Sequence, residues 1–463
     1  MMKSSPQKRM WIINITFVFV LSLAVPVTAA SEIKNHPEVR VHVKTKLKAG
    51  VSHEDAIHAF EKLMDYFKAN FQPENGYMGI EKSNEGTILH LFVDYKSIAA
   101  YGTASSRYAR SKEWLTRWEN TVQLYCEGGY QYAAYFSTAS LRVGDAVSDL
   151  SKGQEGKIFF TSINLGSFRE ILAGEGESKP VTIFGTLKMP KGVSGKVPAV
   201  IILHGVGGVN DHYFEVADML NEMGIAGFVV DSFRPRGVNG IALAKSGFHS
   251  YAIRISDAYA ALELLSTHPK IDRNKIAVLG FSHGGAVALF AASEKIRYSF
   301  IADDLRFAAS IAYYPPCGTQ FQHIDFTAAP ILMLLAEKDN MAPVAGCLKY
   351  AERIRESGAD VKVVVYKGAH HQFPVLQGDE LIKVSNLPDW SRCGMEALIF
   401  LRDDGTCFFP HTNKTIDEVN AIDGEYTADC RIDGGAIVGG NEEAKKKSIK
   451  EYQDLLKRAF NIN

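Results

Sequence analysis

The chain has 463 residues, which predicts two or three domains at roughly 150 residues each. Hydrophobic residues make up 46% and charged residues 22%, as in ordinary soluble globular proteins. The formal net charge of -1, without a basic stripe or an acidic tail, argues against a nucleic-acid partner.

The first thirty residues have the three-part layout of a secretory signal. Basic residues precede an almost wholly apolar stretch over 11–25, and small residues follow Pro26. We predict a signal peptide over residues 1–30, cleaved after Ala29 or Ala30. A retained membrane anchor is the alternative, but this apolar run is short for a span, which needs about 20 residues. The mature protein is therefore expected in the periplasm or secreted, with no stable membrane anchor.

Residues 36–138 are predicted to form a small α+β domain. Apolar and polar residues alternate over 39–43, which is strand spacing, and an apolar helical stripe follows Ser52. The predicted order is strand, helix, strand, strand, helix, strand, which is a ferredoxin-like arrangement. The last four of these elements are expected over 76–82, 87–95, 97–118 and 129–137.

Residues 140–463 are predicted to form an α/β domain with a C-terminal extension. Continuous apolar runs such as Ala199–Leu203 are typical of strands buried on both faces. Their alternation with helices predicts a mainly parallel sheet covered by helices. Strands are expected over 181–189, 199–203, 225–230, 276–279, 307–312, 331–335 and 361–366, and helices over 214–222, 254–267, 343–356 and 442–460.

The run Gly280-Phe281-Ser282-His283-Gly284 has the pattern G-x-S-x-G. A predicted strand ends at Gly280 and a helix-forming run follows Gly285, so Ser282 is predicted to occupy a nucleophile elbow. Glycine suits both flanking positions because side chains there would clash with the adjoining strand and helix. The alternative is a glycine-rich turn that carries a surface serine.

A serine nucleophile needs a base and an acid, which in this fold follow it in the order Ser, acid, His. Asp339 and His371 each come just after a predicted strand, so both should lie at the edge of the sheet that carries Ser282. Glu337 is a rival acid, but its side chain is longer and it is closer to the strand. His370 is a rival base. Asp303 and Asp304 precede a strand and fit the acid position less well.

The oxyanion hole requires two backbone N–H groups. One is predicted to come from His283, which follows the nucleophile, at the positive end of the next helix. The other is predicted to come from Val206, or else Gly207, in the loop after the strand 199–203. His204 is expected to brace that loop.

These segments together resemble the dienelactone hydrolase family over about 240 residues. They are Leu203-His204-Gly205, Asp231-Ser232-Phe233-Arg234-Pro235-Arg236-Gly237, Gly280 to Gly285, Glu337-Lys338-Asp339 and Tyr366 to Phe373. The resemblance implies an α/β-hydrolase fold and favours Asp339 and His371 as acid and base. The enzymes that open dienelactones have a cysteine nucleophile where this chain has Ser282, so the resemblance does not imply a dienelactone substrate.

Other residues near the predicted site have two interpretations each. Arg236 is predicted either to bind a substrate carboxylate or to form an ion pair with Asp231. An exported chain permits disulfides, and one between Cys317 and Cys347 would brace the acid loop, although free buried thiols are the alternative. The remaining cysteines, for which no pairing is predicted, are Cys126, Cys393, Cys407 and Cys430.

The N-terminal domain resembles the antibiotic-biosynthesis-monooxygenase type of dimeric α/β barrel. The resemblance rests on Leu89 to Tyr95, Ala99 to Tyr101 and the following residues to Trp114. It implies a homodimer that pairs through this domain. Some members of that type perform cofactor-free oxidations or bind haem, but no residue here demands either activity.

The sequence therefore predicts an exported serine hydrolase that cleaves a small-molecule carboxylic ester through an acyl-enzyme. No metal or organic cofactor is required. A peptidase or a thioesterase on the same fold is the first alternative. A non-catalytic binding protein on a degenerate hydrolase fold and an oxygenase in the N-terminal domain are the others.

Overall fold

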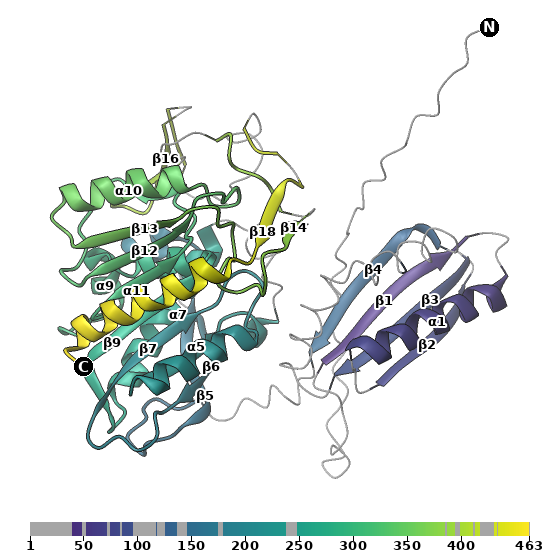
Figure 1. Ribbon diagram of the computed structural model, residues 1–463, viewed down its shortest axis with the longest axis horizontal. Helices are drawn as coiled ribbons and strands as arrows, with labels where there is room; N and C mark the ends of the chain where they lie inside the picture. The colour runs from purple at the N-terminus through teal and green to yellow at the C-terminus, as the bar shows by residue number, and fades with distance from the viewer. Residues whose placement is uncertain are drawn as a thin grey trace, which may run out of the picture. The chain divides into compact units, whose positions relative to one another are not determined.

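The computed structural model of the chain divides into two compact units, Met1–Arg142 and Val143–Asn463 (Figure 1). The predicted signal peptide over residues 1–30 and nearly all of the predicted helix over 97–118 lie outside the described residues. Those described are 39–48, 52–71, 75–83, 86–95, 117, 126–136, 146–174, 179–237, 248–384, 387–393, 399–410, 413–416, 430–432 and 434–462.

The first unit contains an antiparallel sheet with the strand order β2-β3-β1-β4. Helix α1 (His53–Phe71) follows Ser52, as the sequence predicts, and the Asp55 N–H donates to Ser52 Oγ. The ferredoxin-like arrangement stays a prediction, because the second helix lies outside the described residues. The strands are β1 (Val39–Leu47), β2 (Asn75–Ser83), β3 (Gly86–Tyr95) and β4 (Cys126–Phe136).

The second unit is built on an eight-stranded sheet with the order β13-β12-β10-β9-β7-β8-β6-β5. The strands from β13 to β8 pair in parallel, and β6 and β5 are antiparallel. The predicted mainly parallel sheet is confirmed. The strands are β5 (Gly156–Asn164), β6 (Lys179–Lys188), β7 (Val197–Leu203), β8 (Ala226–Asp231), β9 (Ile271–Phe281), β10 (Ser310–Tyr313), β12 (Ile331–Ala336) and β13 (Val361–Tyr366).

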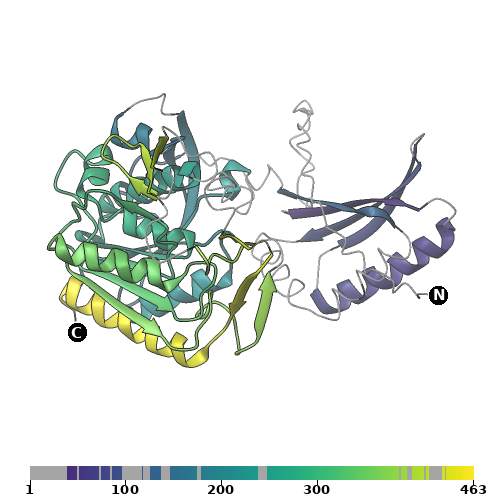
Figure 2. The ribbon, with the colours of Figure 1, turned by 90° about the horizontal axis from the view of Figure 1, so that it is seen from above.

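Helices cover both faces of this sheet because its central strands are apolar on both sides. Along β7, Ala199, Ile201 and Leu203 face one core cluster, whereas Val200 and Ile202 face another. Helices α7 (Phe248–Ser266), α8 (His283–Phe290) and α10 (Val344–Glu356) pack on one face. Helices α5 (Asp211–Glu222) and α11 (Glu442–Phe460) pack on the other, and Figure 2 shows α11 on the opposite side from α10.

Short elements complete the unit. Helices α4 (Phe168–Leu172) and α9 (Glu294–Phe300) and a 3₁₀ turn, η1 (Arg234–Arg236), connect the strands. The C-terminal extension, which is the part of the chain from residue 381 onward, contributes strands to two small sheets that were not predicted from the sequence. One has the order β11-β15-β16-β17, and the other pairs β14 with β18. Their strands are β11 (Thr319–Phe321), β14 (Leu381–Val384), β15 (Ile399–Leu401), β16 (Cys407–Phe409), β17 (Lys414–Ile416) and β18 (Ala436–Gly439).

Candidate active site

Ser282 stands between the end of β9 and the start of α8. Its backbone has φ 54 and ψ -118, a region that residues other than glycine rarely adopt. Its N–H donates to the carbonyl oxygen of Tyr313 at 2.9 Å, which ties the turn to β10. A strained strand-to-helix turn of this kind lifts the hydroxyl out of the sheet and is the elbow that the sequence predicts.

The two glycines of the pattern allow the backbone to pass very closely. A Cβ atom on Gly280 would lie 1.9 Å from the carbonyl oxygen of Gly284. A Cβ atom on Gly284 would lie 2.4 Å from the carbonyl oxygen of Leu203. Because backbone atoms are obstructed in both cases, any larger residue would displace β9, α8 or β7 and with them Ser282.

The three predicted residues Ser282, His371 and Asp339 meet at this turn. His371 Nε2 lies 2.9 Å from Ser282 Oγ, and His371 Nδ1 lies 2.6 Å from Asp339 Oδ2. The histidine and aspartate side chains are only 2% and 1% exposed. An ionised carboxylate can only accept, so Nδ1 carries the proton and Nε2 can accept the proton of the serine hydroxyl.

The aspartate is held by the turn that follows β12. Asp339 Oδ1 accepts the N–H groups of Met341 and Ala342 at 2.9 and 2.8 Å, which leaves Oδ2 for the histidine. The rival Glu337 is exposed, and its Oε2 accepts the N–H of Gly368 at 2.9 Å. Glu337 therefore supports the histidine loop without touching the His371 ring.

The two neighbouring histidines in the loop after β13 have different surroundings. His371 contacts Ser282, and its ring forms a T-shaped pair with the Tyr314 ring, with 4.5 Å between centroids. His370 Nδ1 is buried without a hydrogen-bond partner among the described residues. Burial lowers the pKa of His370, although Asp339 opposes this shift. The geometry favours His371 over the rival His370.

The loop after β7, which carries Val206, passes close to the elbow: a Cβ atom on Gly205 would lie 3.6 Å from Ser282 Cβ. The Gly205 N–H is already occupied, since it donates to the Tyr213 hydroxyl at 2.8 Å. The Gly205 carbonyl accepts from His204 Nδ1 at 2.7 Å and from the Gly208 N–H at 3.2 Å. The Gly205 carbonyl and the Val206 N–H belong to the same trans peptide and point in opposite directions. The Val206 N–H therefore points away from the His204 ring and the Gly208 N–H, which hold the carbonyl. No hydrogen bond to it occurs in the part of the chain that the structure describes.

Arg236 has a different partner from the predicted one. Its Nη1 and Nη2 each lie 2.8 Å from a carboxylate oxygen of Asp257, Nε donates to Asn164, and Nη1 also donates to the Ser232 carbonyl. The predicted ion pair with Asp231 is therefore wrong. Because the side chain is only 5% exposed and these contacts engage all three nitrogens, the structure gives it a supporting position and not one facing a substrate.

The C-terminal extension fastens both loops that carry the acid and the base. Asn340 Nδ2 donates to Asp389 and to the Gly435 carbonyl, and its Oδ1 accepts the N–H of Ile437 at 2.8 Å. The Gly439 N–H donates to the His371 carbonyl at 3.0 Å, within a β-bridge between His371 and β18. The extension is thus part of the scaffold of the site.

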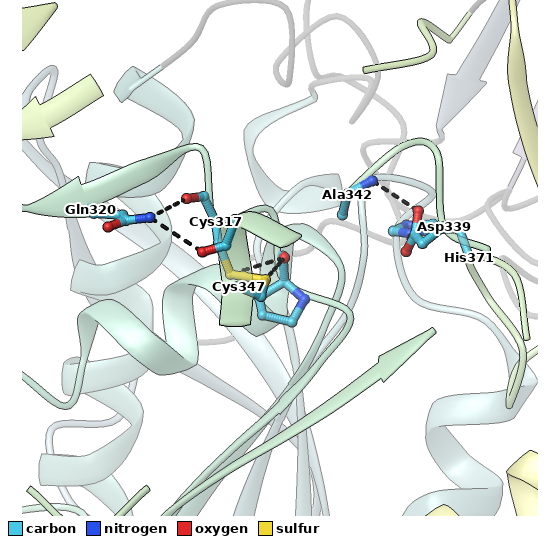
Figure 3. The surroundings of a disulfide bond; sticks show 8 residues. Cys317, Gln320, Asp339, Ala342, Cys347 and His371 are labelled. Carbon is cyan, nitrogen blue, oxygen red and sulfur yellow. Dashed lines mark hydrogen bonds and ion pairs between the residues drawn. A yellow bond between two sulfur atoms is a disulfide. The ribbon is translucent and has the colours of Figure 1, made fainter. Parts of the chain in front are cut away.

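Two disulfides lie in this unit. Cys317–Cys347, the pair that the sequence suggests, joins the segment after β10 to α10 near the Asp339 loop (Figure 3). Gln320 Nε2 donates to the carbonyls of Cys317 and Gly346, so it joins the same two segments as the disulfide. The second disulfide is Cys393–Cys430, within the C-terminal extension. Cys407 is a buried free thiol.

The part of the chain that the structure describes lacks two kinds of feature. Within it, no group of three or more His, Cys, Asp or Glu side chains could hold a metal ion. Within the same residues, no helix combines the length and apolar character that crossing a membrane requires.

Three buried histidines surround the elbow in the neutral state. Burial, followed by the nearby Arg254, lowers the pKa of His204 and of His283 well below the ordinary value. Burial lowers the pKa of His212 to about 3, with a smaller contribution from Lys445. These histidines stay neutral in the folded protein but would take up protons in the unfolded chain below its pKa of about 6.5.

Acid is therefore expected to destabilise the protein before its carboxylates titrate. Below about pH 6.5 the unfolded state binds more protons, so the free energy of unfolding falls by up to about 1.4 kcal/mol per pH unit for each such histidine. For His212 this window extends down to about pH 3. Urea unfolding between about pH 7.5 and pH 5 measures the slope. His212→Phe should flatten it, whereas a substitution of His323, 80% exposed, should not. Equal slopes in wild type and His212→Phe would contradict this expectation.

Two supporting residues on helix α7 were not predicted from the sequence. Arg254 and Asp257 are both fully buried, in a helix whose other buried residues are mostly apolar. A charged pair spaced three residues apart within such an apolar run was the available signal. Asn340 was also overlooked, because its partners lie far away in the sequence.

One comparison with known proteins matches a segment of the second unit. Residues 183–392 match the family model described as Dienelactone hydrolase family. The match supports that family, a hydrolase and an α/β-hydrolase fold with a mostly parallel central sheet. The N-terminal resemblance to a monooxygenase-type barrel is not supported.

Individual relatives are distant. A Bradyrhizobium protein named "Probable 2-oxo-3-(5-oxofuran-2-ylidene)propanoate lactonase" is 26% identical over 217 residues, 45% of this chain and 85% of its own length. Acylamino-acid-releasing enzyme 2 of Oryza sativa is 22% identical over 226 residues, 40% of this chain and 29% of its own. Among solved structures, esterase 2 of Thermogutta terrifontis is 15% identical and covers 42% of this chain and 82% of its own, with a TM-score of 0.34.

Proposed function

We propose that this protein is a serine hydrolase that cleaves carboxylic esters through a Ser282 acyl-enzyme. The observation that carries the proposal is the continuous hydrogen-bonded series from Asp339 through His371 to Ser282, with distances of 2.6 and 2.9 Å. Nucleophile, base and acid at such distances are the arrangement that activates a serine hydroxyl.

The reaction follows from the proton positions. Ser282 Oγ attacks the ester carbonyl carbon while its proton passes to His371 Nε2, and Asp339 stabilises the imidazolium through Nδ1. The oxyanion accepts the backbone N–H groups of Val206 and His283. The tetrahedral intermediate then expels the alcohol, which takes the proton from Nε2. A water molecule repeats the sequence on the acyl-enzyme and releases the acid and free Ser282.

A fluorophosphonate probe tests this proposal directly. The expected result is one covalent adduct on the intact protein, mapped by mass spectrometry to the peptide that contains Ser282, together with hydrolysis of p-nitrophenyl esters. An unlabelled protein would favour the non-catalytic binding function. A panel of matched ester, thioester and peptide substrates separates the esterase from its alternatives, the thioesterase and the peptidase.

Export is the second part of the proposal. Its support is the signal-like segment over residues 1–30 and the two disulfides, since disulfides persist mainly in oxidising compartments. The compartment is then the periplasm or the exterior of the cell.

A further inference from the structure

Arg254 is a fully buried cation behind the elbow that the reaction above does not use. It lies on α7, with its side chain among the largest that are completely shielded from solvent. Nη1 lies 2.9 Å from His283 Nδ1, and Nη2 donates to the His204 carbonyl. One guanidinium therefore connects the residue after the nucleophile with the loop that carries Val206.

The contact fixes the protonation of His283. A guanidinium has only donors, so His283 Nδ1 must be the acceptor and its proton must be on Nε2. The ring also stacks on Tyr251 with 4.1 Å between centroids and 17° between planes. Burial and Arg254 lower the pKa of His283 well below its ordinary value, consistent with a neutral ring. The first residue of α8 is thereby clamped from two sides.

The same cation also supports the other half of the predicted oxyanion hole. The His204 carbonyl that accepts from Arg254 belongs to the peptide whose N–H, that of Gly205, donates to Tyr213. The His204 ring in turn holds the Gly205 carbonyl and accepts the Ser232 N–H at Nε2. The orientation of the Val206 N–H thus depends on a network that begins at Arg254.

The charge of Arg254 is not balanced locally. Three guanidinium groups gather here with two carboxylates: Arg234 pairs with Asp231 at 3.2 Å, and Arg236 pairs with Asp257 at 2.8 Å. Arg254 has no carboxylate within salt-bridge distance among the described residues. Its Nε has no hydrogen-bond partner there, and its guanidinium lies 5.1 Å above the Phe233 ring. Burial lowers its pKa to about 10, so it remains charged near neutral pH.

An unbalanced buried charge is costly to a fold unless something negative appears beside it. The proposed reaction creates such a charge, the oxyanion, at the N–H groups of Val206 and His283. We infer that Arg254 is a positioning residue for that reaction: it holds both oxyanion donors in place and its positive charge favours the tetrahedral intermediate. This inference rests on the proposed function.

Neutral and charged substitutions of Arg254 separate the effect of its charge and hydrogen bonds on the reaction from the effect of its packing on stability. Arg254→Met removes the cation and both hydrogen bonds, and we expect kcat on p-nitrophenyl esters to fall roughly 10²-fold, as for loss of one oxyanion donor, with KM nearly unchanged. Arg254→Lys keeps the charge and should recover at least about tenfold of that loss. Rates are expressed per Ser282 titrated to completion with the fluorophosphonate, so unfolded molecules do not count.

A second buried arginine provides the matched control. Arg297 is 2% exposed, pairs with Glu294 at 2.6 Å and donates to the Asp303 carbonyl. Arg297→Met should lower stability but keep kcat per titrated site within about twofold of wild type. If the Arg254→Met protein does not fold, His283→Leu removes the acceptor of Nη1, leaves the backbone N–H, and should still lower kcat about fivefold or more at constant KM.

Two results would overturn the inference. One is a wild-type kcat per titrated site in Arg254→Met or in His283→Leu. The other is an equal loss of kcat in Arg254→Lys and Arg254→Met, which would show that the charge has no effect. If the wild-type protein itself neither binds the fluorophosphonate at Ser282 nor hydrolyses esters, the proposed function fails, which is a separate outcome.

Discussion

The Ser282→Ala protein is expected to fold normally and to lose roughly 10⁶-fold in kcat for ester hydrolysis. The expectation follows from the proposed reaction, in which Oγ forms the acyl bond, and from the 2.9 Å between Oγ and His371 Nε2. Alanine accepts the backbone of φ 54 about as poorly as serine does, so the elbow itself should persist. Steady-state kinetics measure the loss of kcat, fluorophosphonate labelling measures the loss of the nucleophile, and thermal unfolding checks the fold.

A buried serine on the neighbouring strand provides the control for Ser282→Ala. Ser310 lies on β10, and its hydroxyl donates only to the Ala288 carbonyl among the described residues. Ser310→Ala should retain kcat within about twofold and label fully. If Ser282→Ala were labelled as fast as wild type, or hydrolysed esters at a comparable rate, another nucleophile would carry the reaction.

The Asp339→Asn protein is expected to keep its fold and to lose roughly 10⁴-fold in kcat. Asparagine Oδ1 can still accept the N–H groups of Met341 and Ala342. Its amide, however, would donate to His371 Nδ1, which moves the imidazole proton to Nε2. Nε2 can then no longer accept the proton of Ser282. Measuring kcat and thermal unfolding on the same preparation separates this effect from a loss of stability.

The rival acid offers a direct comparison. Glu337→Gln keeps a side-chain oxygen for the Gly368 N–H, the contact that Glu337 makes in the structure. We expect kcat within about threefold of wild type. A steep loss in Glu337→Gln combined with near-normal activity in Asp339→Asn would reverse the assignment of the acid.

Local patterns were enough to predict the central sheet and the residues at its edge. Strands buried on both faces leave long apolar runs such as Ala199–Leu203, and parallel strands bring their carboxyl ends to one edge. Asp339 and His371 could therefore be placed beside Ser282 without any knowledge of distant contacts. Helix α7 begins at Phe248, earlier than the predicted start at Arg254, because its first turns carry no clear helical stripe.

Pairings between distant segments could not be predicted in this way. Arg236 was matched to the nearby Asp231, yet Asp231 accepts the N–H groups of Phe233 and Arg234, and Arg236 reaches Asp257 on α7. The strands of the two small sheets are only three or four residues long, too short to show a period. Asn340 is recognisable as a supporting residue only once its partners from the extension are in place.

The bridge between His371 and β18 also bears on the order in which the enzyme is completed during synthesis. The ribosome delivers Ser282, Asp339 and His371 well before it delivers the residues of β18. Until that strand docks, the carbonyl of His371 lacks the Gly439 N–H that holds it in the finished protein. We therefore expect the loop that carries His371 to reach its final geometry only after β18 has been synthesised and has docked.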